Sequence, residues 1–303
     1  MPANYRTYSD FLSAKFPDCV KVQKIGVTTG YSCPNRDGTI GRGGCAYCNN
    51  DSFSPDYTRD SEKGQRIIEM LERGKKFFAR KYPMMKYLAY FQSYTNTHGD
   101  SPQRLMNLYR EAANVDDVVG LVIGTRPDCV PDDLLDLLAE MNSSICPVFL
   151  EFGAESTHDA TLNAINRCHT WQTTRDAVER CSCRGLTSGL HFIMGLPGET
   201  ENMMLESVRE AVKLPIETLK FHQLQIIRNT RFEKEYAENP DKFELFTPER
   251  YANLCRRIIS IVAPSGIAIE RFVSQSPDDL LIAPRWGIKN YQFTNMLNNE
   301  TKG

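Results

Sequence analysis

The sequence lacks the long apolar run that a membrane-spanning helix needs, since nowhere do about 18 apolar residues follow one another. Its first residues, MPANYRTYSDFLSAKF, contain no apolar core of a secretory signal. It also has no internal repeat, low-complexity tract or long flexible linker. With 41% hydrophobic residues, the chain is too apolar to be mainly disordered. We therefore expect a folded cytoplasmic protein that makes no contact with a membrane.

A strong excess of charge of either sign is also missing. The net charge of −2 argues against a strongly basic nucleic-acid-binding module. The charge is unevenly distributed, however, because residues 1–90 carry 15 Lys and Arg against 9 Asp and Glu. A basic face in this part would suit phosphates, and an ordinary solvated surface accounts for the same residues equally well.

The ten cysteines are many for such a chain. Secreted proteins pair cysteines as disulfides, whereas a cytoplasmic setting favours metal or redox chemistry. Cys33, Cys45 and Cys48 lie close together, while the other seven are scattered through periodic segments in which a buried thiol is ordinary.

Apolar runs alternate with amphipathic helical patterns along most of the chain. This alternation predicts a parallel sheet with helices outside it. Six repeats, without a sign of eight, favour an α/β fold with a partial (β/α)6 TIM-like barrel over residues 1–240 and a C-terminal extension over 241–303. The predicted strands are 24–29, 86–92, 118–125, 147–153, 190–195 and 219–227, and the predicted helices are 64–82, 102–113, 131–141, 173–183 and 202–214.

The three clustered cysteines follow the first predicted strand, and in such barrels the chemistry gathers at the C-terminal ends of the strands. Three thiolates within sixteen residues are able to hold one iron–sulfur cube and leave one of its four irons without a protein ligand. The glycines between them allow the backbone to wrap closely around such a cluster. A structural zinc site is the alternative, with Cys19 as the nearest fourth thiol, although zinc usually takes two CxxC pairs or paired histidines.

The spacing Cys33-x11-Cys45-x2-Cys48, with Tyr47 before the last cysteine, resembles the radical S-adenosylmethionine (SAM) superfamily. The usual spacing there is Cys-x3-Cys-x2-Cys, and the long first gap with its CPNRDG and GGCAYC flanks is similar to YtqA/YhcC-type proteins. These are related to the radical SAM half of the Elongator catalytic subunit. The resemblance covers nearly the whole chain and implies a [4Fe–4S] cluster and SAM as cofactors.

The resemblance also implies which residues contact SAM. The segment Tyr90–Thr97 would replace the Gly-Gly-Glu stretch that holds the SAM amino group elsewhere in the superfamily. Glu151, inside the apolar run FLEFG, needs a ligand or an Arg as partner if it is buried. The six predicted cofactor contacts are Ser93, Thr95, Asn96, Glu151, Arg167 and Gly195.

Several other residues leave two interpretations open. Arg126 after the third strand suits an anion, or it pairs with Asp128 to stiffen the turn. Cys168 stands where the family has glycine, and with Cys181 and Cys183 it indicates either a second metal site or thiols of a helical core. The charged and aromatic side chains of Arg285, Trp286 and Lys289 near the C-terminus suit nucleotides.

The resemblance implies reductive cleavage of SAM to a 5′-deoxyadenosyl radical, with an electron donor such as flavodoxin or ferredoxin. Kinship with the Elongator subunit implies tRNA as substrate and the side chain at carbon 5 of a wobble uridine as target. The alternatives are a radical SAM enzyme for a small metabolite or a protein, and a non-catalytic iron–sulfur or zinc-binding protein. No catalytic side chain is assigned from the sequence.

Overall fold

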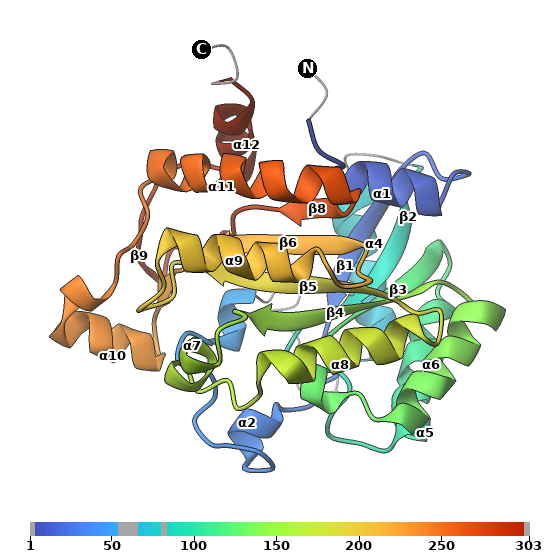
Figure 1. Cartoon of the computed structure of the whole chain (residues 1–303). Helices are drawn as coiled ribbons and strands as arrows, with labels where there is room; N and C mark the ends of the chain where they lie inside the picture. Colours follow the sequence, from blue (N-terminus) through green and yellow to red (C-terminus); the bar gives the residue numbers. More distant parts are fainter. Residues whose placement is uncertain (1–3, 54–65, 80–83, 300–303) are drawn as a thin grey trace.

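A curled sheet of parallel strands forms the centre of the protein, and the computed structural model describes residues 4–53, 66–79 and 84–299 (Figure 1). Its seven strands follow in the order β1-β2-β3-β4-β5-β6-β8, so that β1 and β8 are its edges. Their bounds are β1 Val22–Val27, β2 Lys86–Phe91, β3 Val118–Thr125, β4 Val148–Glu155, β5 Thr187–Met194, β6 Thr218–Gln223 and β8 Ala268–Arg271. A short antiparallel pair, β7 Ile226–Ile227 and β9 Leu281–Ala283, lies beside it.

The larger helices cover the outer face of this sheet, as the row of α8, α9 and α11 in Figure 1 shows. The apolar sides of these helices form one buried core with the strands. Parallel strands are apolar on both faces, so the outer face of the sheet has to be shielded from water by helices. The helices are α1 Tyr8–Lys15, α2 Pro34–Asp37, α4 Ile67–Ala79, α5 Pro102–Ala113, α6 Asp132–Ser144, α7 Asp159–Ala164, α8 Trp171–Ser182, α9 Glu201–Ala211, α10 Arg231–Glu238, α11 Pro248–Val262 and α12 Asn290–Asn299. Among the described residues, no helix is long and apolar enough to cross a membrane.

Helix α1 closes the end of the curled sheet at which the strands begin. Its Phe11 and Leu12, with Phe16 just after it, pack against Leu88 and Phe149 from the inner face of the sheet. The residue before α1, Thr7, forms a parallel bridge with Ile269 of β8. The N-terminal segment therefore covers part of the gap between the two edge strands.

The predicted fold class, a partial barrel of the α/β type, is confirmed. All six predicted strands are present, and the last one is divided into β6 and β7. The structure adds β8, which lies in the segment 241–303 and pairs with β6. Because β8 has only four residues, it is too short to give a clear strand pattern in the sequence. The division of the chain near residue 240 stays a prediction.

Four charged side chains from four strands form a closed ring inside the curled sheet, which we call the charge ring. Lys24 of β1 pairs with Glu151 of β4 and, at 2.6 Å, with Glu270 of β8. Lys220 of β6 pairs with the same two carboxylates, each at 2.9 Å. Lys220 and Glu151 are almost fully buried. The ring thus connects the two edge strands, which share no backbone ladder.

Replacing Lys24 by Met is expected to lower the free energy of unfolding by about 3–5 kcal/mol, because two carboxylates lose a buried partner. Urea unfolding measures the loss. The matched control is Lys213→Met, which removes an exposed pair with Glu210 and costs about 1 kcal/mol or less. Similar small losses in both variants would contradict the role of the charge ring.

Candidate active site

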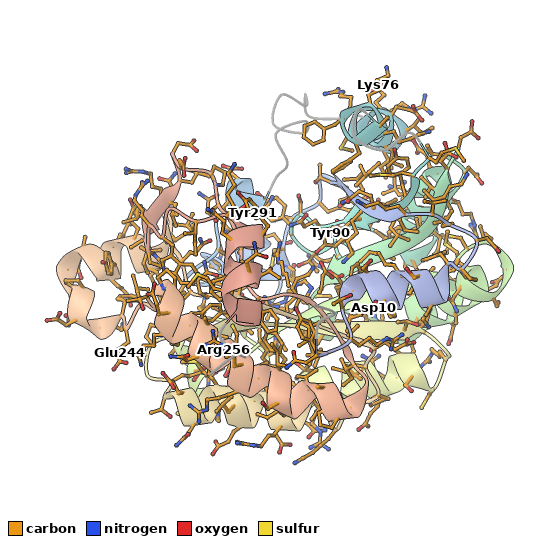
Figure 2. The ribbon with its side chains drawn as sticks, turned by 90° about the horizontal axis from the view of Figure 1, so that it is seen from above. Asp10, Lys76, Tyr90, Glu244, Arg256 and Tyr291 are labelled. Atoms are coloured by element: carbon orange, nitrogen blue, oxygen red, sulfur yellow. The ribbon has the colours of Figure 1, made fainter. Side chains whose placement is uncertain are left out.

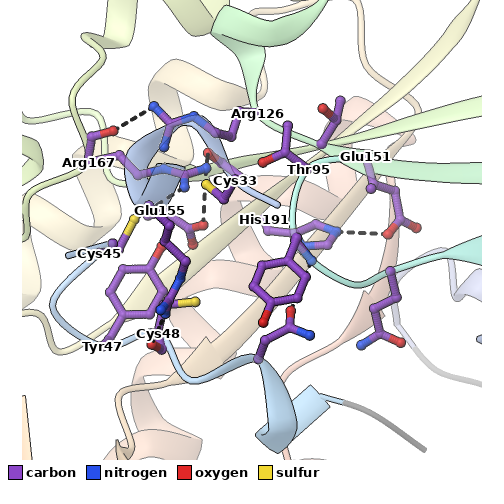
Figure 3. A pocket seen from close by; sticks show the side chains of 18 of the residues that line it. Cys33, Cys45, Tyr47, Cys48, Thr95, Arg126, Glu151, Glu155, Arg167 and His191 are labelled. Atoms are coloured by element: carbon purple, nitrogen blue, oxygen red, sulfur yellow. Dashed lines mark hydrogen bonds and ion pairs between the residues drawn. The ribbon is translucent and has the colours of Figure 1, made fainter. Parts of the chain in front are cut away.

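A cavity lies at the C-terminal ends of the strands and encloses about 930 Å³, including its open mouth. The cysteine loop forms one side of it, and the strand ends of β2 to β6 and β8 form the rest. Figure 3 shows the three cysteines, Arg126 and Arg167 on one side, with Glu151 and His191 on the other. The lining residues are Cys33, Arg36, Gly44, Cys45, Tyr47, Cys48, Asn50, Tyr90, Gln92, Tyr94, Thr95, Gly124, Thr125, Arg126, Glu151, Gly153, Glu155, Arg167, His191, His222 and Arg271.

The cysteine loop has a defined shape because its backbone bonds to itself and to a neighbouring loop. Cys33 is the N-cap of the short helix α2. The amide of Gly44 donates to the carbonyl of Asn35 at 2.8 Å, and that of Ala46 donates to the carbonyl of Ile165 at 2.9 Å. Gly44 has a φ of +76°, and a Cβ there would meet Arg36 Nε at 2.9 Å, so that only glycine fits without a shift.

Two nitrogen donors approach the sulfur of Cys45. Asn35 Nδ2 lies 3.6 Å and Arg167 Nη1 3.5 Å from this Sγ, and both side chains are buried. Asn35 also donates to the carbonyl of Asn166 at 2.5 Å, which connects the cysteine loop to the loop after α7. Such donors stabilise a sulfur atom that carries negative charge.

Four polar atoms of the lining are buried without a hydrogen-bond partner in the described part of the chain. They are Thr95 Oγ1, Arg126 Nη1, Arg167 Nε and Arg271 Nε. The other guanidinium nitrogens of Arg126 bind Asp128 at 2.9 and 2.7 Å, and those of Arg167 bind the carbonyl of Gly153 and the sulfur of Cys45. Buried donors are normally satisfied, so these atoms indicate a polar, anionic ligand. Three thiols beside such donors fit an iron–sulfur cluster with a carboxylate-bearing ligand.

The profile of the radical SAM superfamily matches residues 30–211, and that of the Radical_SAM C-terminal domain matches residues 216–302. The chain belongs to the radical SAM superfamily. Its cofactors are therefore a [4Fe–4S] cluster and SAM, and it is an enzyme. Protein YhcC of Escherichia coli K12 is 37% identical over 267 residues, 88% of this chain and 82% of the relative. YtqA of Bacillus subtilis, described as uncharacterized, is 32% identical over 283 residues, 92% and 84% of the two chains.

The fold is also similar to that of a solved structure, the archaeal Methanocaldococcus infernus Elp3 with an N-terminal deletion. The TM-score is 0.64 at 13% identity, and the match covers 93% of this chain. It spans 64% of the Elp3 chain, so that about a third of Elp3 has no counterpart here. At this identity the likeness concerns the fold alone.

Of the three residues predicted after β2, Thr95 alone is among those that line this cavity. Asn96 is fully buried, and its side chain donates to the carbonyls of Phe91 and Gly124 at 2.8 Å each. It therefore joins the ends of β2 and β3. Ser93 is buried as well but does not line the cavity. Sequence spacing could not separate these roles, because the chain turns immediately after β2 and Tyr94 has a φ of +57°.

Arg167 lies in the cavity beside the cysteines, whereas the structure does not bring Gly195 there. Gly195 has a φ of +91° and lines a separate depression, where a Cβ would meet the ring of Phe246 at 3.0 Å. Gly195 therefore allows close packing of the Phe246 ring of this chain, whereas the sequence predicted a contact with SAM. Phe246 belongs to the segment after α10, whose position the sequence pattern does not reveal.

Glu151 lines the cavity, and the chain itself supplies partners for both of its carboxylate oxygens. These are Lys24, Lys220 and, at 2.9 Å, His191. Its pKa lies well below the usual value because the positive charges of Lys220 and Lys24 outweigh its burial. Two features of the sequence could have revealed this arrangement: a lysine within each of the apolar runs KIGV and LKF, where a charged residue is rare without a partner.

The open questions about the remaining motifs are answered in part. Arg126 pairs with Asp128, as one interpretation predicted, and keeps one donor free for a ligand. Cys168 is exposed, while Cys181 is fully buried in the core. Trp286 stacks on Phe293 and donates to the carbonyl of Phe246 at 2.8 Å, so that it packs within the protein.

Cys19 precedes β1 and Cys33 follows it, so that a strand about 20 Å long separates them. The closed four-cysteine zinc site that includes Cys19 is therefore excluded by the fold. Among the described residues, no three His, Cys, Asp or Glu side chains are grouped closely enough for a single metal ion.

Replacing Asn35 by Ala is expected to lower the free energy of unfolding by about 1–3 kcal/mol, since the carbonyl of Asn166 loses its partner. The same variant should lose its iron more quickly to a chelator, because the loop that carries Cys45 is less well held. Asn253→Ala on the exposed face of α11 is the control. A wild-type rate of iron loss in Asn35→Ala would show that this contact does not support the loop.

Proposed function

We propose that this chain is a cytoplasmic radical SAM enzyme in which Cys33, Cys45 and Cys48 hold the [4Fe–4S] cluster and SAM occupies the adjoining cavity. One observation supports this more than any other: three thiols line a single cavity together with buried donors that lack partners. When bound, the cluster and SAM supply a 5′-deoxyadenosyl radical that removes a hydrogen atom from a substrate carbon.

The chain's own residues bind and orient in this proposal. Asn35 and Arg167 donate toward the Cys45 sulfur and stabilise its negative charge. Arg126 and Arg167 direct free donors at the SAM carboxylate, and Thr95 offers a hydroxyl to its amino group. We assign Ser93 and Asn96 to positioning the end of β2. The buried lining excludes water from a reactive intermediate.

For the substrate, we propose a tRNA and, within it, the carbon-5 side chain of a wobble uridine. The resemblance of the cysteine-loop motifs to the family related to the Elongator catalytic subunit and the basic composition of residues 1–90 support this. The cavity lining adds support, because it bears four arginines, Arg36, Arg126, Arg167 and Arg271, against two glutamates. An electron donor such as flavodoxin or ferredoxin would reduce the cluster.

A small metabolite is the second candidate. Sites that enclose small molecules are concave and combine aromatic side chains with a few polar groups, as this cavity does with Tyr47, Tyr90 and its arginines. Binding of tRNA at low salt distinguishes the two candidates, because an enzyme that acts on a small metabolite is not expected to bind tRNA.

The anaerobically reconstituted protein is expected to contain about four irons per chain and, with dithionite and SAM, to form 5′-deoxyadenosine. Cys45→Ala should lose both properties. Cys183→Ala is the matched control, because this exposed thiol follows α8 and does not line the cavity. Chromatography of 5′-deoxyadenosine and iron analysis measure the outcome. Equal product from wild type and Cys45→Ala would overturn the ligand assignment.

Bulk tRNA from a strain that lacks the gene should show an altered modified uridine, seen by mass spectrometry of nucleosides. A plasmid with the wild-type gene should restore the profile, and one with Cys45→Ala should not. An unchanged nucleoside profile in the deletion strain would rule out tRNA and leave the metabolite candidate.

A further inference from the structure

The cavity has a second charged end, away from the cysteines, where it adjoins a groove on the side of the curled sheet. This side groove lies between α1 and α4, and Figure 2 shows Tyr90 between α1, which bears Asp10, and α4, which bears Lys76. Tyr90, Gln92 and Arg271 line both the cavity and the groove. The groove and the cavity therefore adjoin each other at these three side chains.

A β-bulge directs Arg271 to this place. In the pairing of β6 with β8, Leu219 lies opposite Ile269, but Lys220 lies opposite Arg271, which leaves Glu270 without a partner in the register. Successive strand residues normally face opposite sides, whereas a bulge re-aims a side chain. Here Glu270 joins the charge ring and the next residue, Arg271, also lines the cavity.

Among the described residues, the charges around Arg271 leave its guanidinium without an anion. Both oxygens of Glu270 are taken by Lys24 and Lys220, at 2.6 and 2.9 Å, and Glu151 is bound to the same two lysines. Within the described residues the Arg271 side chain makes no ion pair or hydrogen bond, and its Nε is buried without a partner. Two lysines thus balance two glutamates, and one cation remains.

The neighbouring histidine adds no charge of its own and is suited to a neutral contact. Burial and then the positive charge of Arg271 lower the pKa of His222 to about 3, so that its ring is neutral at physiological pH. Its Nδ1 lies 3.2 Å from the carbonyl of Gln223 and donates to it, which leaves Nε2 as an acceptor. A hydrogen-bond donor of the ligand is able to bind to His222 Nε2.

We infer that Arg271 holds an oxyanion of the substrate, a carboxylate or a phosphate, at the end of the cavity opposite the cysteines. The inference rests on the proposed function, because that proposal places SAM at the cysteine end of the cavity and leaves the end with Arg271 for the substrate. A guanidinium binds either oxyanion through two parallel N–H donors. Arg271 lies where the cavity adjoins the side groove, whereas Arg126 and Arg167 lie at the cysteine end.

The test measures binding of inorganic phosphate and of acetate by calorimetry, with reconstituted protein saturated with SAM. Wild type should bind at least one of the two, and Arg271→Gln should bind it about tenfold or more weakly, the loss expected for a charged hydrogen bond. Arg271→Lys keeps the charge and should retain part of the affinity. The control is Arg257→Gln, an arginine on the outer helix α11 that pairs with Glu201 and should behave as wild type.

Which probe binds identifies the oxyanion, since phosphate favours the tRNA backbone and acetate favours a carboxylate on the substrate. Equal binding by wild type and Arg271→Gln, or no binding of either probe by wild type, overturns the inference. The affinity for SAM, measured by equilibrium dialysis, should stay within about twofold in Arg271→Gln. A tenfold loss of SAM affinity would instead assign Arg271 to the SAM carboxylate. No turnover enters the test, so its failure is distinct from a failure to form 5′-deoxyadenosine or to modify tRNA.

Discussion

The two edge strands of the curled sheet are joined by charges, and the interior depends on this connection. Lys24 of β1 and Glu270 of β8 meet across the open side, and Glu151 and Lys220 complete the charge ring from β4 and β6. A buried ion pair is no richer source of stability than apolar packing, because desolvation offsets much of its attraction. The charge ring instead disfavours other positions of the four strands, because moving one strand would leave its charge buried without a partner. The ring thus sets the distance between the edges and leaves the side of the sheet open.

This constraint also determines which charges are available to ligands. Of the two glutamates that line the cavity, Glu151 is bound to Lys24 and Lys220, and Glu155 pairs with Arg167 at 3.6 Å. Burial, followed by the charge of Lys220, lowers the pKa of His191, so that this side chain is neutral although it contacts Glu151 at 2.9 Å. Among the described residues, the guanidinium nitrogens of the cavity that lack a partner therefore lie at its two ends, on Arg126 and Arg167 near the cysteines and on Arg271 near the side groove. A cavity with unpartnered cationic donors at both ends fits two anionic groups at once.

The elements that were predicted well are those whose pattern is long. The run VVGLVIGT was predicted as residues 118–125, the bounds that β3 has, and PQRLMNLYREAA coincides with α5. The cysteine loop was recognised because its spacing is itself a chemical signal. What the sequence could not show depends on three-dimensional register. Thr95 and Asn96 are neighbours in sequence, yet one lines the cavity and the other joins two strand ends, and the bulge that turns Arg271 inward leaves no trace in a four-residue strand.

Backbone strain explains why the loops around the cavity were the hardest part to foresee. Six non-glycine residues have a positive φ in the described part of the chain, and four of them, Tyr94, Glu155, Asn166 and Cys168, lie in the cavity lining or beside Arg167. Each such residue costs on the order of 1–3 kcal/mol and persists only where its surroundings determine it. Here the Asn166 side chain donates to the carbonyl of Gly44 at 2.8 Å, and its own carbonyl accepts from the Asn35 side chain. Two loops far apart in the sequence thus hold each other in a conformation that neither favours alone, and this mutual support keeps Arg167 beside Cys45.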